Sequence, residues 1–179
     1  MGFRKVSLFG AFAAAVLLVA CGQPASSVQP LAAVPTLAPA APAAASCEKS
    51  IDVNLSRQEL VARDCDGVFL STPITSGRPG LRTPTGTFNV FLKQQDVTFI
   101  SPWPEGDPNY YPPMPVAYAM EFLDGGYFLH TDPDEPVSAF GRGSEDGLYA
   151  SHGCVHVPYA VMSGLYAWAD DGTQVSIHY

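Results

Sequence analysis

A cysteine in the last part of the chain has the neighbours that a nucleophilic thiol requires. Cys154 stands in the segment Ser-His-Gly-Cys-Val-His at residues 151–156, and another histidine, His130, lies upstream. A thiol attacks an amide carbonyl only as the thiolate, so a nearby imidazole has to take its proton and later return it to the leaving amine. A lone buried cysteine is usually an inert small side chain. Here a nucleophile, a base and a flexible glycine coincide, and the pattern predicts covalent acyl transfer by Cys154.

The first twenty residues indicate where that chemistry takes place. Arg4 and Lys5 precede an uncharged apolar run, residues 6–20, which is typical of a signal peptide and short for a membrane span. The run ends in Leu-Val-Ala directly before Cys21, which resembles a bacterial lipoprotein cleavage site. The resemblance implies cleavage before Cys21 and a lipid on that residue that holds the protein at a membrane surface. A plain secretory signal with an incidental cysteine is the alternative.

The rest of the chain divides into a spacer and one domain. Residues 21–46 are mostly Ala, Pro, Ser, Gln and Val without charge, so we expect an extended tether after the lipidated cysteine. Residues 47–179 are then one catalytic domain, long enough to bury a core. The formal net charge of −8 and the lack of a basic patch predict no nucleic-acid partner. We expect a monomer in the cell envelope, outside the cytoplasm.

The other cysteines support export. Cys47 and Cys65 bracket a predicted hairpin, and in an oxidising compartment we expect them to form a disulfide. Closing that loop would stabilise the domain by about 3 kcal/mol. Two free thiols are the alternative, because spacing does not prove contact. Neither cysteine belongs to a Cys-x-x-Cys pair, so no zinc site is predicted, and Cys154 is left as the odd thiol.

Alternation of apolar and polar residues predicts a mainly β domain. Thr-Pro-Thr-Gly at residues 83–86 fits a type I turn, and the proline-rich residues 101–115 fit an irregular loop. One helix is predicted between Pro158 and Gly172, because apolar residues there recur at helical spacing. The expected strands cover residues 51–55, 59–62, 68–75, 88–92, 116–122, 127–129 and 173–179.

Four ordered segments give the sequence a specific resemblance to one family. Ser-His-Gly-Cys at residues 151–154, with His130 at a strand end, is similar to the signature of the L,D-transpeptidase catalytic domain, the YkuD-type family. Residues 83–88 resemble a turn of that family, residues 120–130 the strand pair that delivers its histidine, and residues 172–175 its last strand. The resemblance implies an L,D-transpeptidase-like β-sandwich with one packed helix.

The resemblance also implies a reaction. Cys154 would be the nucleophile, His130 the general base and acid, and the backbone carbonyl of Thr131 would hold the other nitrogen of the His130 ring. The thiolate would attack the carbonyl of an L-centre residue in a peptidoglycan tetrapeptide stem, and the terminal D-amino acid would leave. A side-chain amine of another stem would then take the acyl group. No metal or organic cofactor is implied.

Further residues receive roles from the same resemblance. Ser151 and His152 would shape the pocket and support the thiolate, and the backbone N–H groups of Gly153 and Cys154 would help line an oxyanion site. Tyr118 is a further candidate for substrate binding. The aromatic residues of the proline-rich loop would grip a glycan or simply pack within the loop: Trp103, Tyr110 and Tyr111.

Two features depart from the family pattern. The spacing between His130 and Ser151 is longer than usual, and the excess lies in an acidic, glycine-rich loop, residues 132–147, which we expect to form part of a substrate lid. His156 stands where the family usually carries Arg or Asn, so a shorter and only partly charged group would meet the substrate there. Arg142 in the long loop is a candidate to compensate, and an arginine that simply faces water is the alternative.

The sequence thus predicts an L,D-transpeptidase that forms peptidoglycan cross-links in cell-wall biogenesis and so bears on cell shape. The first alternative is an L,D-carboxypeptidase, in which water takes the acyl group. The second is a non-catalytic cell-wall-binding lipoprotein with an unreactive thiol. The third is an enzyme that attaches an envelope protein to the wall. Acceptor choice depends on pocket shape, which a sequence does not give.

Overall fold

The computed structural model describes residues 48–179. The predicted signal peptide (residues 1–20), the lipidated Cys21, the tether (residues 21–46) and Cys47 lie outside the described residues. The pairing of Cys47 with Cys65 therefore stays a prediction. Within the described part, none of the helices has the length and apolar character that crossing a bilayer requires.

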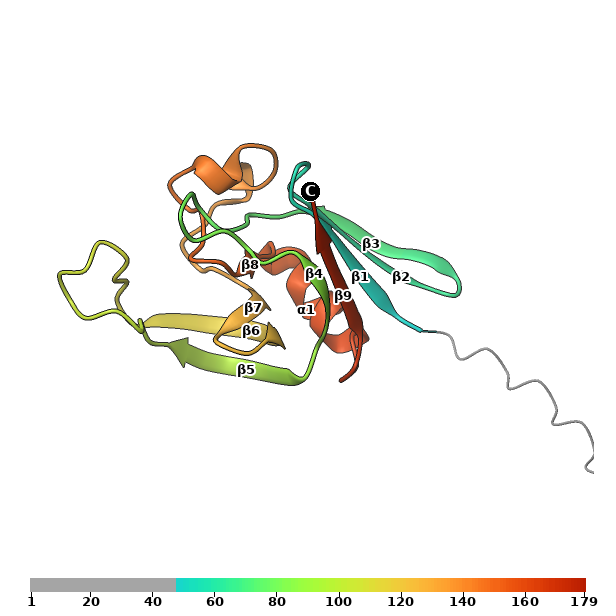
Figure 1. The fold of residues 1–179 in the computed structure, drawn as a ribbon. Helices are drawn as coiled ribbons and strands as arrows, with labels where there is room; N and C mark the ends of the chain where they lie inside the picture. Colours follow the sequence, from blue (N-terminus) through green and yellow to red (C-terminus); the bar gives the residue numbers. More distant parts are fainter. Residues whose placement is uncertain (1–47) are drawn as a thin grey trace, which may run out of the picture. The chain divides into compact units, whose positions relative to one another are not determined.

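The first of two sheets joins the beginning of the described chain to its end. Its strands lie in the order β3-β2-β1-β9-β4, and β1 runs parallel to β9 while the other neighbours are antiparallel. Figure 1 shows the last strand, β9, between the two early strands β1 and β4. The strands of this sheet are β1 (Ser50–Asn54), β2 (Glu59–Asp64), β3 (Gly67–Pro73), β4 (Gly86–Asn89) and β9 (Gln174–His178).

The second sheet carries the predicted chemistry. It comprises β5 (Leu92–Phe99), β6 (Met114–Leu123), β7 (Tyr127–His130) and β8 (Val155–His156), in that order. Strands β7 and β8 are parallel, and the chain between them includes two short 3-10 helices, η1 (Val137–Ala139) and η2 (Ser144–Asp146). A parallel pair needs a long crossover connection, and here that connection is the long loop.

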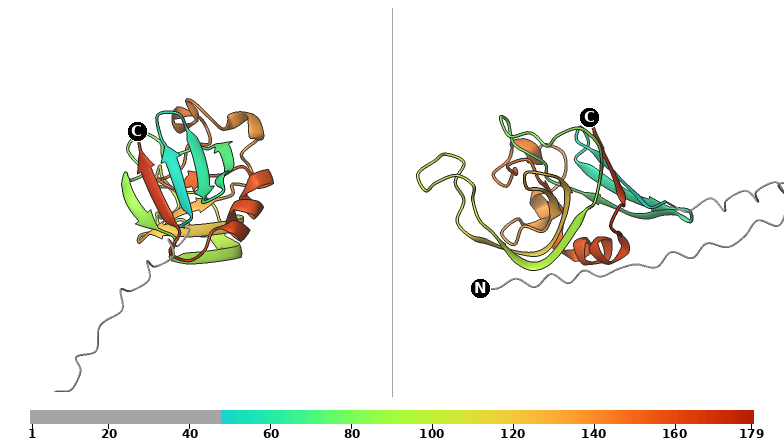
Figure 2. Two further views of the ribbon diagram at one scale, coloured as in Figure 1. Left: turned by 90° about the vertical axis from the view of Figure 1, so that its right-hand side faces the viewer. Right: turned by 60° about the horizontal axis from the view of Figure 1, so that its bottom comes forward.

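One α-helix, α1 (Tyr159–Trp168), packs on this framework (Figures 1 and 2). It begins directly after Pro158, whose fixed φ suits a helix start and which has no N–H to leave unpaired. Met162 and Leu165 are fully buried and join apolar residues of both sheets in one core. Burial of such side chains is worth about 1.5–3 kcal/mol each, so α1 depends on its apolar face.

For residues 48–179, the predicted mainly β architecture with a single packed α-helix is confirmed. One predicted strand, residues 88–92, is wrong in detail, because the chain there leaves one sheet and enters the other. Val90 N–H donates to Thr173 O beside β9, whereas Phe91 N–H donates to Glu121 O on β6. Val90 itself is fully buried at this crossing. The alternation of apolar residues continues across this crossing. It therefore does not reveal that the chain changes sheets there.

Candidate active site

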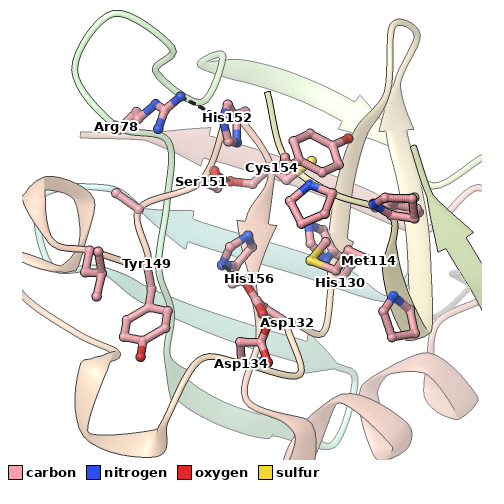
Figure 3. Close-up of a pocket in the computed structure, with 17 residues that line it drawn as sticks. Arg78, Met114, His130, Asp132, Asp134, Tyr149, Ser151, His152, Cys154 and His156 are labelled. Atoms are coloured by element: carbon pink, nitrogen blue, oxygen red, sulfur yellow. Dashed lines mark hydrogen bonds and ion pairs between the residues drawn. The ribbon is translucent and has the colours of Figure 1, made fainter. Parts of the chain in front are cut away.

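A cavity of about 360 Å³ opens where β7 ends and β8 begins. It brings together six residues that the sequence singled out: Tyr111, His130, Ser151, His152, Cys154 and His156. Figure 3 labels the last five of them. Two acidic side chains of the long loop, Asp132 and Asp134, also line it.

The parallel pairing of β7 with β8 sets the place of the thiol. His130 lies opposite His156 in this register, and Cys154 directly precedes β8. Phe128 N–H donates to Cys154 Sγ at 3.4 Å, and the thiol donates to Gly126 O at 3.3 Å. Cys154 is a free thiol that keeps part of its surface accessible.

The ring of His130 is held by backbone and by neighbouring rings. Its Nδ1 donates to Thr131 O at 2.9 Å, which leaves Nε2 as the nitrogen able to accept a proton. His130 is 2% exposed. Its ring packs edge-on against the rings of Phe99 and His156, with centroids 5.0 and 4.7 Å away. Among residues 48–179 no hydrogen bond joins His130 to Cys154. Catalytic contacts of this kind often tighten only when substrate is bound.

Burial keeps both reacting groups uncharged. Burial, with a smaller contribution from the charge of His156, lowers the pKa of His130 to about 3, and the bond to Thr131 opposes the shift. Burial likewise raises the pKa of Cys154 to about 12, against the bond from Phe128 and together with the negative charge of Glu121. The resting pair is therefore a thiol and a neutral imidazole, and the thiolate forms only as a base takes its proton.

Two hydroxyl groups fix the peptide at Cys154. Ser151 Oγ donates to Cys154 O at 2.6 Å, and Thr83 Oγ1 donates to the same oxygen at 3.2 Å. Thr83 Oγ1 in turn accepts Gly77 N–H at 2.9 Å. Sequence reasoning placed Thr83 in a turn and gave it no part in the site, although the turn motif itself was the available signal.

Gly153 is required by its backbone, and its predicted role needs correction. Its φ is +120°, and a Cβ there would lie 2.8 Å from Tyr127 Cε1. We expected its N–H to bind an oxyanion, but this N–H donates to Ser151 Oγ at 3.0 Å. Of the two predicted backbone donors, the N–H of Cys154 remains the candidate.

His152 belongs to the rim of the cavity. Arg78 Nη2 donates to His152 Nε2 at 2.7 Å and to Asn109 Oδ1 at 2.9 Å. The rings of Trp103 and Tyr111 lie with centroids 5.3 Å from that of His152. Burial lowers the pKa of His152, and the Arg78 charge adds to this. Arg78 was not among the sequence candidates, because nothing in its local sequence indicates the cavity.

His156 is bound by the long loop. Its Nδ1 lies 2.7 Å from Glu135 Oε2 and 3.7 Å from Asp132 Oδ2. Glu135 is buried, and its other oxygen accepts the hydroxyl of Thr75. Asp132, Glu135 and His156 are residue types that bind metals, with ligand atoms within 4.8 Å of one another. Two ligands about 2.0–2.1 Å from one tetrahedral ion lie about 3.4 Å apart, so the Glu135–His156 contact has the length of a hydrogen bond instead.

Two predicted substrate-binding residues lie outside the cavity. Tyr118 packs on α1, with its ring centroid 5.3 Å from that of Tyr166 and 6.3 Å from that of Tyr159. Arg142 is exposed and does not line the cavity, since Gly141 N–H ties this part of the loop to Ile74 O.

Comparison with known proteins gives a consistent result. Residues 48–177 match the YkuD family, described as the L,D-transpeptidase catalytic domain. A structure of the Ldtfm–avibactam carbamoyl enzyme is 30% identical, with a TM-score of 0.65 over 74% of this chain and 49% of that one. A cysteine-to-serine mutant of the Enterococcus faecium L,D-transpeptidase is also 30% identical, with a TM-score of 0.65 over 73% of this chain and 50% of that one.

The isolated catalytic domain of the E. faecium L,D-transpeptidase is 29% identical, with a TM-score of 0.62 over 75% of this chain and 100% of that domain. The chain thus spans about half the length of the first two proteins and all of the isolated domain. No curated protein matches the sequence.

Proposed function

The chain belongs to the L,D-transpeptidase catalytic domain family, and on that premise we propose that it forms peptidoglycan cross-links through an acyl-enzyme on Cys154. The observation that carries the proposal is the shared cavity of a free thiol and a neutral imidazole on paired strand ends. Cys154 lines this cavity and keeps part of its surface exposed.

The first half of the proposed reaction acylates the enzyme. His130 Nε2 takes the proton of the Cys154 thiol as Sγ attacks the carbonyl of an L-centre residue in a tetrapeptide stem. A C–S bond forms, and the Cys154 N–H stabilises the oxyanion. The C–N bond to the terminal D-amino acid then breaks, and His130 returns the proton to the leaving amine.

The second half transfers the acyl group. A side-chain amine of another stem attacks the thioester carbonyl and gives a proton to His130 as the C–N bond forms. The C–S bond then breaks, and His130 returns the proton to the Cys154 sulfur. Ser151 and Thr83 support both halves by holding the Cys154 peptide in place. Burial lowers the pKa of His130, so its Nε2 is unprotonated in the resting protein and has a free lone pair for the thiol proton.

The test compares the wild type with Cys154→Ala. Incubated with a tetrapeptide stem or with avibactam, the wild type should gain the mass of one acyl group, and the alanine variant should gain none. Chromatography of the stem products then identifies the acceptor. Dimeric stems support the transpeptidase, whereas trimmed monomers alone would replace it with an L,D-carboxypeptidase. A wild type that binds stems but is never acylated would be the non-catalytic wall-binding protein.

We place this reaction outside the cytoplasm, with the protein held by lipid on Cys21. The support is the sequence pattern before Cys21 and a family whose members act on the cell wall. Cys21→Ser in the full chain should remove labelling by a fatty acid. The protein should then either leave the membrane fraction for the soluble fraction or keep its signal peptide uncleaved. Unchanged labelling would disprove the anchor and leave the catalytic proposal intact.

A further inference from the structure

The two departures from the family pattern meet in one contact. They are His156 and the long loop, residues 132–147, which sequence reasoning set apart from the pattern that the resemblance implies. That loop supplies Glu135, whose Oε2 lies 2.7 Å from His156 Nδ1. The side chain of Glu135 is 0% exposed and that of His156 is 7% exposed. A buried carboxylate is costly to desolvate unless it is bonded on both oxygens, and Thr75 bonds the second one.

The contact determines which nitrogen of His156 carries a proton. A carboxylate is an acceptor, so the ring has to donate from Nδ1. Nε2 is then the nitrogen left for the cavity, which His156 lines together with His130 and Cys154. The groups that face His156 are Asp132 and Glu135 from the loop, His130 from β7 and Thr75 from the segment that bridges to β8.

The same contact also determines where the ring lies. His156 is edge-on to His130 with ring centroids 4.7 Å apart, and the two residues are neighbours in the register of β7 and β8. The backbone fixes the Cα positions, but only Glu135 and Asp132 hold the ring of His156 by polar contacts among the described residues. A rotation of His156 would therefore change the packing of the base.

We propose that Glu135 is a positioning residue of the active site, which acts through His156 to hold the ring of His130 and to keep His156 Nε2 toward the substrate. Glu135 of the long loop and His156 then act together on the ring of His130. This inference rests on the proposed acyl transfer at Cys154. It goes beyond that reaction by assigning a role to a residue that touches neither the thiol nor the substrate.

The first test reads the ring nitrogens directly. Nitrogen-15 NMR of the full-length protein, at a pH where His156 is neutral, should show His156 protonated on Nδ1. Glu135→Met removes the acceptor at similar volume, and His156 should then carry its proton on Nε2. Glu135→Gln restores an uncharged acceptor and should restore the Nδ1 proton in part. A wild type with an unprotonated Nδ1 would overturn the proposal whatever the enzyme's activity.

The second test measures the rate of acylation of Cys154. A base displaced by a distant substitution can cost up to about 100-fold in rate, so we expect Glu135→Met to slow acylation about 10- to 100-fold, mainly in kcat, with partial recovery in Glu135→Gln. Asp146→Asn is the matched control, because Asp146 lies on the same loop and pairs with Arg82 on the surface. It should change acylation by less than about twofold.

A double-mutant cycle separates positioning from simple loss of structure. If Glu135 acts through His156, Glu135→Met should add nothing to His156→Asn. Independent, multiplying effects would overturn the proposal. Wild type that is not acylated at all would refute the reaction at Cys154, whereas normal acylation by Glu135→Met would refute only the role of Glu135.

Discussion

The floor and the rim of the cavity are built in different ways. The floor comprises His130, Cys154 and His156, which lie on or directly beside the paired strands β7 and β8. The rim includes Arg78 and His152, which come from loops and are only part-buried. Strand register fixes the backbone of the floor, whereas side-chain contacts between loops hold the rim. The residues whose precise placement the chemistry requires therefore have backbones that the sheet positions.

The largest effect is expected at the floor. His130→Gln removes the base but keeps a polar side chain of similar size, so acylation of Cys154 should fall about 10²- to 10⁴-fold. Stopped-flow or timed mass measurement of the acyl-enzyme gives this rate. A loss of less than tenfold would mean that another group takes the thiol proton and that the floor is not the catalytic region.

Acid should destabilise the protein through His130. The pKa of His130 is about 3 in the folded protein and 6.5 in the reference state, so below pH 6.5 the unfolded chain binds more protons. The stability that comes from the neutral buried ring is complete above pH 6.5 and lost as the pH falls toward 3. Between pH 7 and pH 4 the wild type should lose about 3 kcal/mol more than His130→Gln in urea unfolding. Equal losses would contradict the buried, neutral state of His130.

A smaller effect is expected from Thr83, whose hydroxyl holds the backbone of the floor residue Cys154. Thr83→Val removes one hydroxyl from Cys154 O and leaves the Gly77 N–H without its acceptor. An unpaired buried N–H costs about 1–3 kcal/mol, so thermal stability should fall and acylation should slow about tenfold. Thr85→Val on the same turn is the control, because Thr85 is exposed. Equal behaviour of the two variants would show that the turn does not support Cys154.

The smallest effect is expected at the rim. Arg78→Gln loses the contact with His152 but leaves the strand pairing untouched. We expect a change of about two- to fivefold in KM for the stem with kcat nearly unchanged, as for loss of binding that is equal in ground and transition states. Arg57→Gln, at an exposed ion pair with Glu59, is the control. A loss in kcat as large as that of His130→Gln would erase the distinction between floor and rim.

Much of this could be predicted from the sequence, and the reasons for the gaps are physical. His130 and Cys154 were found because their chemistry depends on residue type and local order. Glu135 was missed, because its partner is 21 residues away and a carboxylate in an acidic loop has no local mark. The prediction that Tyr118 contacts the substrate is wrong, because strand alternation defines two faces without indicating which one lines the cavity.

The fold shows the same division. The strand alternation of β1 was readable, because its buried positions recur with period two. The two-residue strand β8 was not, since it is held by its register with β7 and by the bridge from Thr75 to His156. Contacts between segments far apart in the chain carry that information, and a single sequence does not display them.

The most direct test of the central claim is to locate the acyl group on the protein. After reaction with a tetrapeptide stem, digestion and tandem mass spectrometry should place the added mass on the sulfur of Cys154, in the peptide that contains Ser151 and His152. An acyl group on any other residue, or a Cys154 that stays fully reactive to alkylation in the protein that carries the acyl group, would contradict the account.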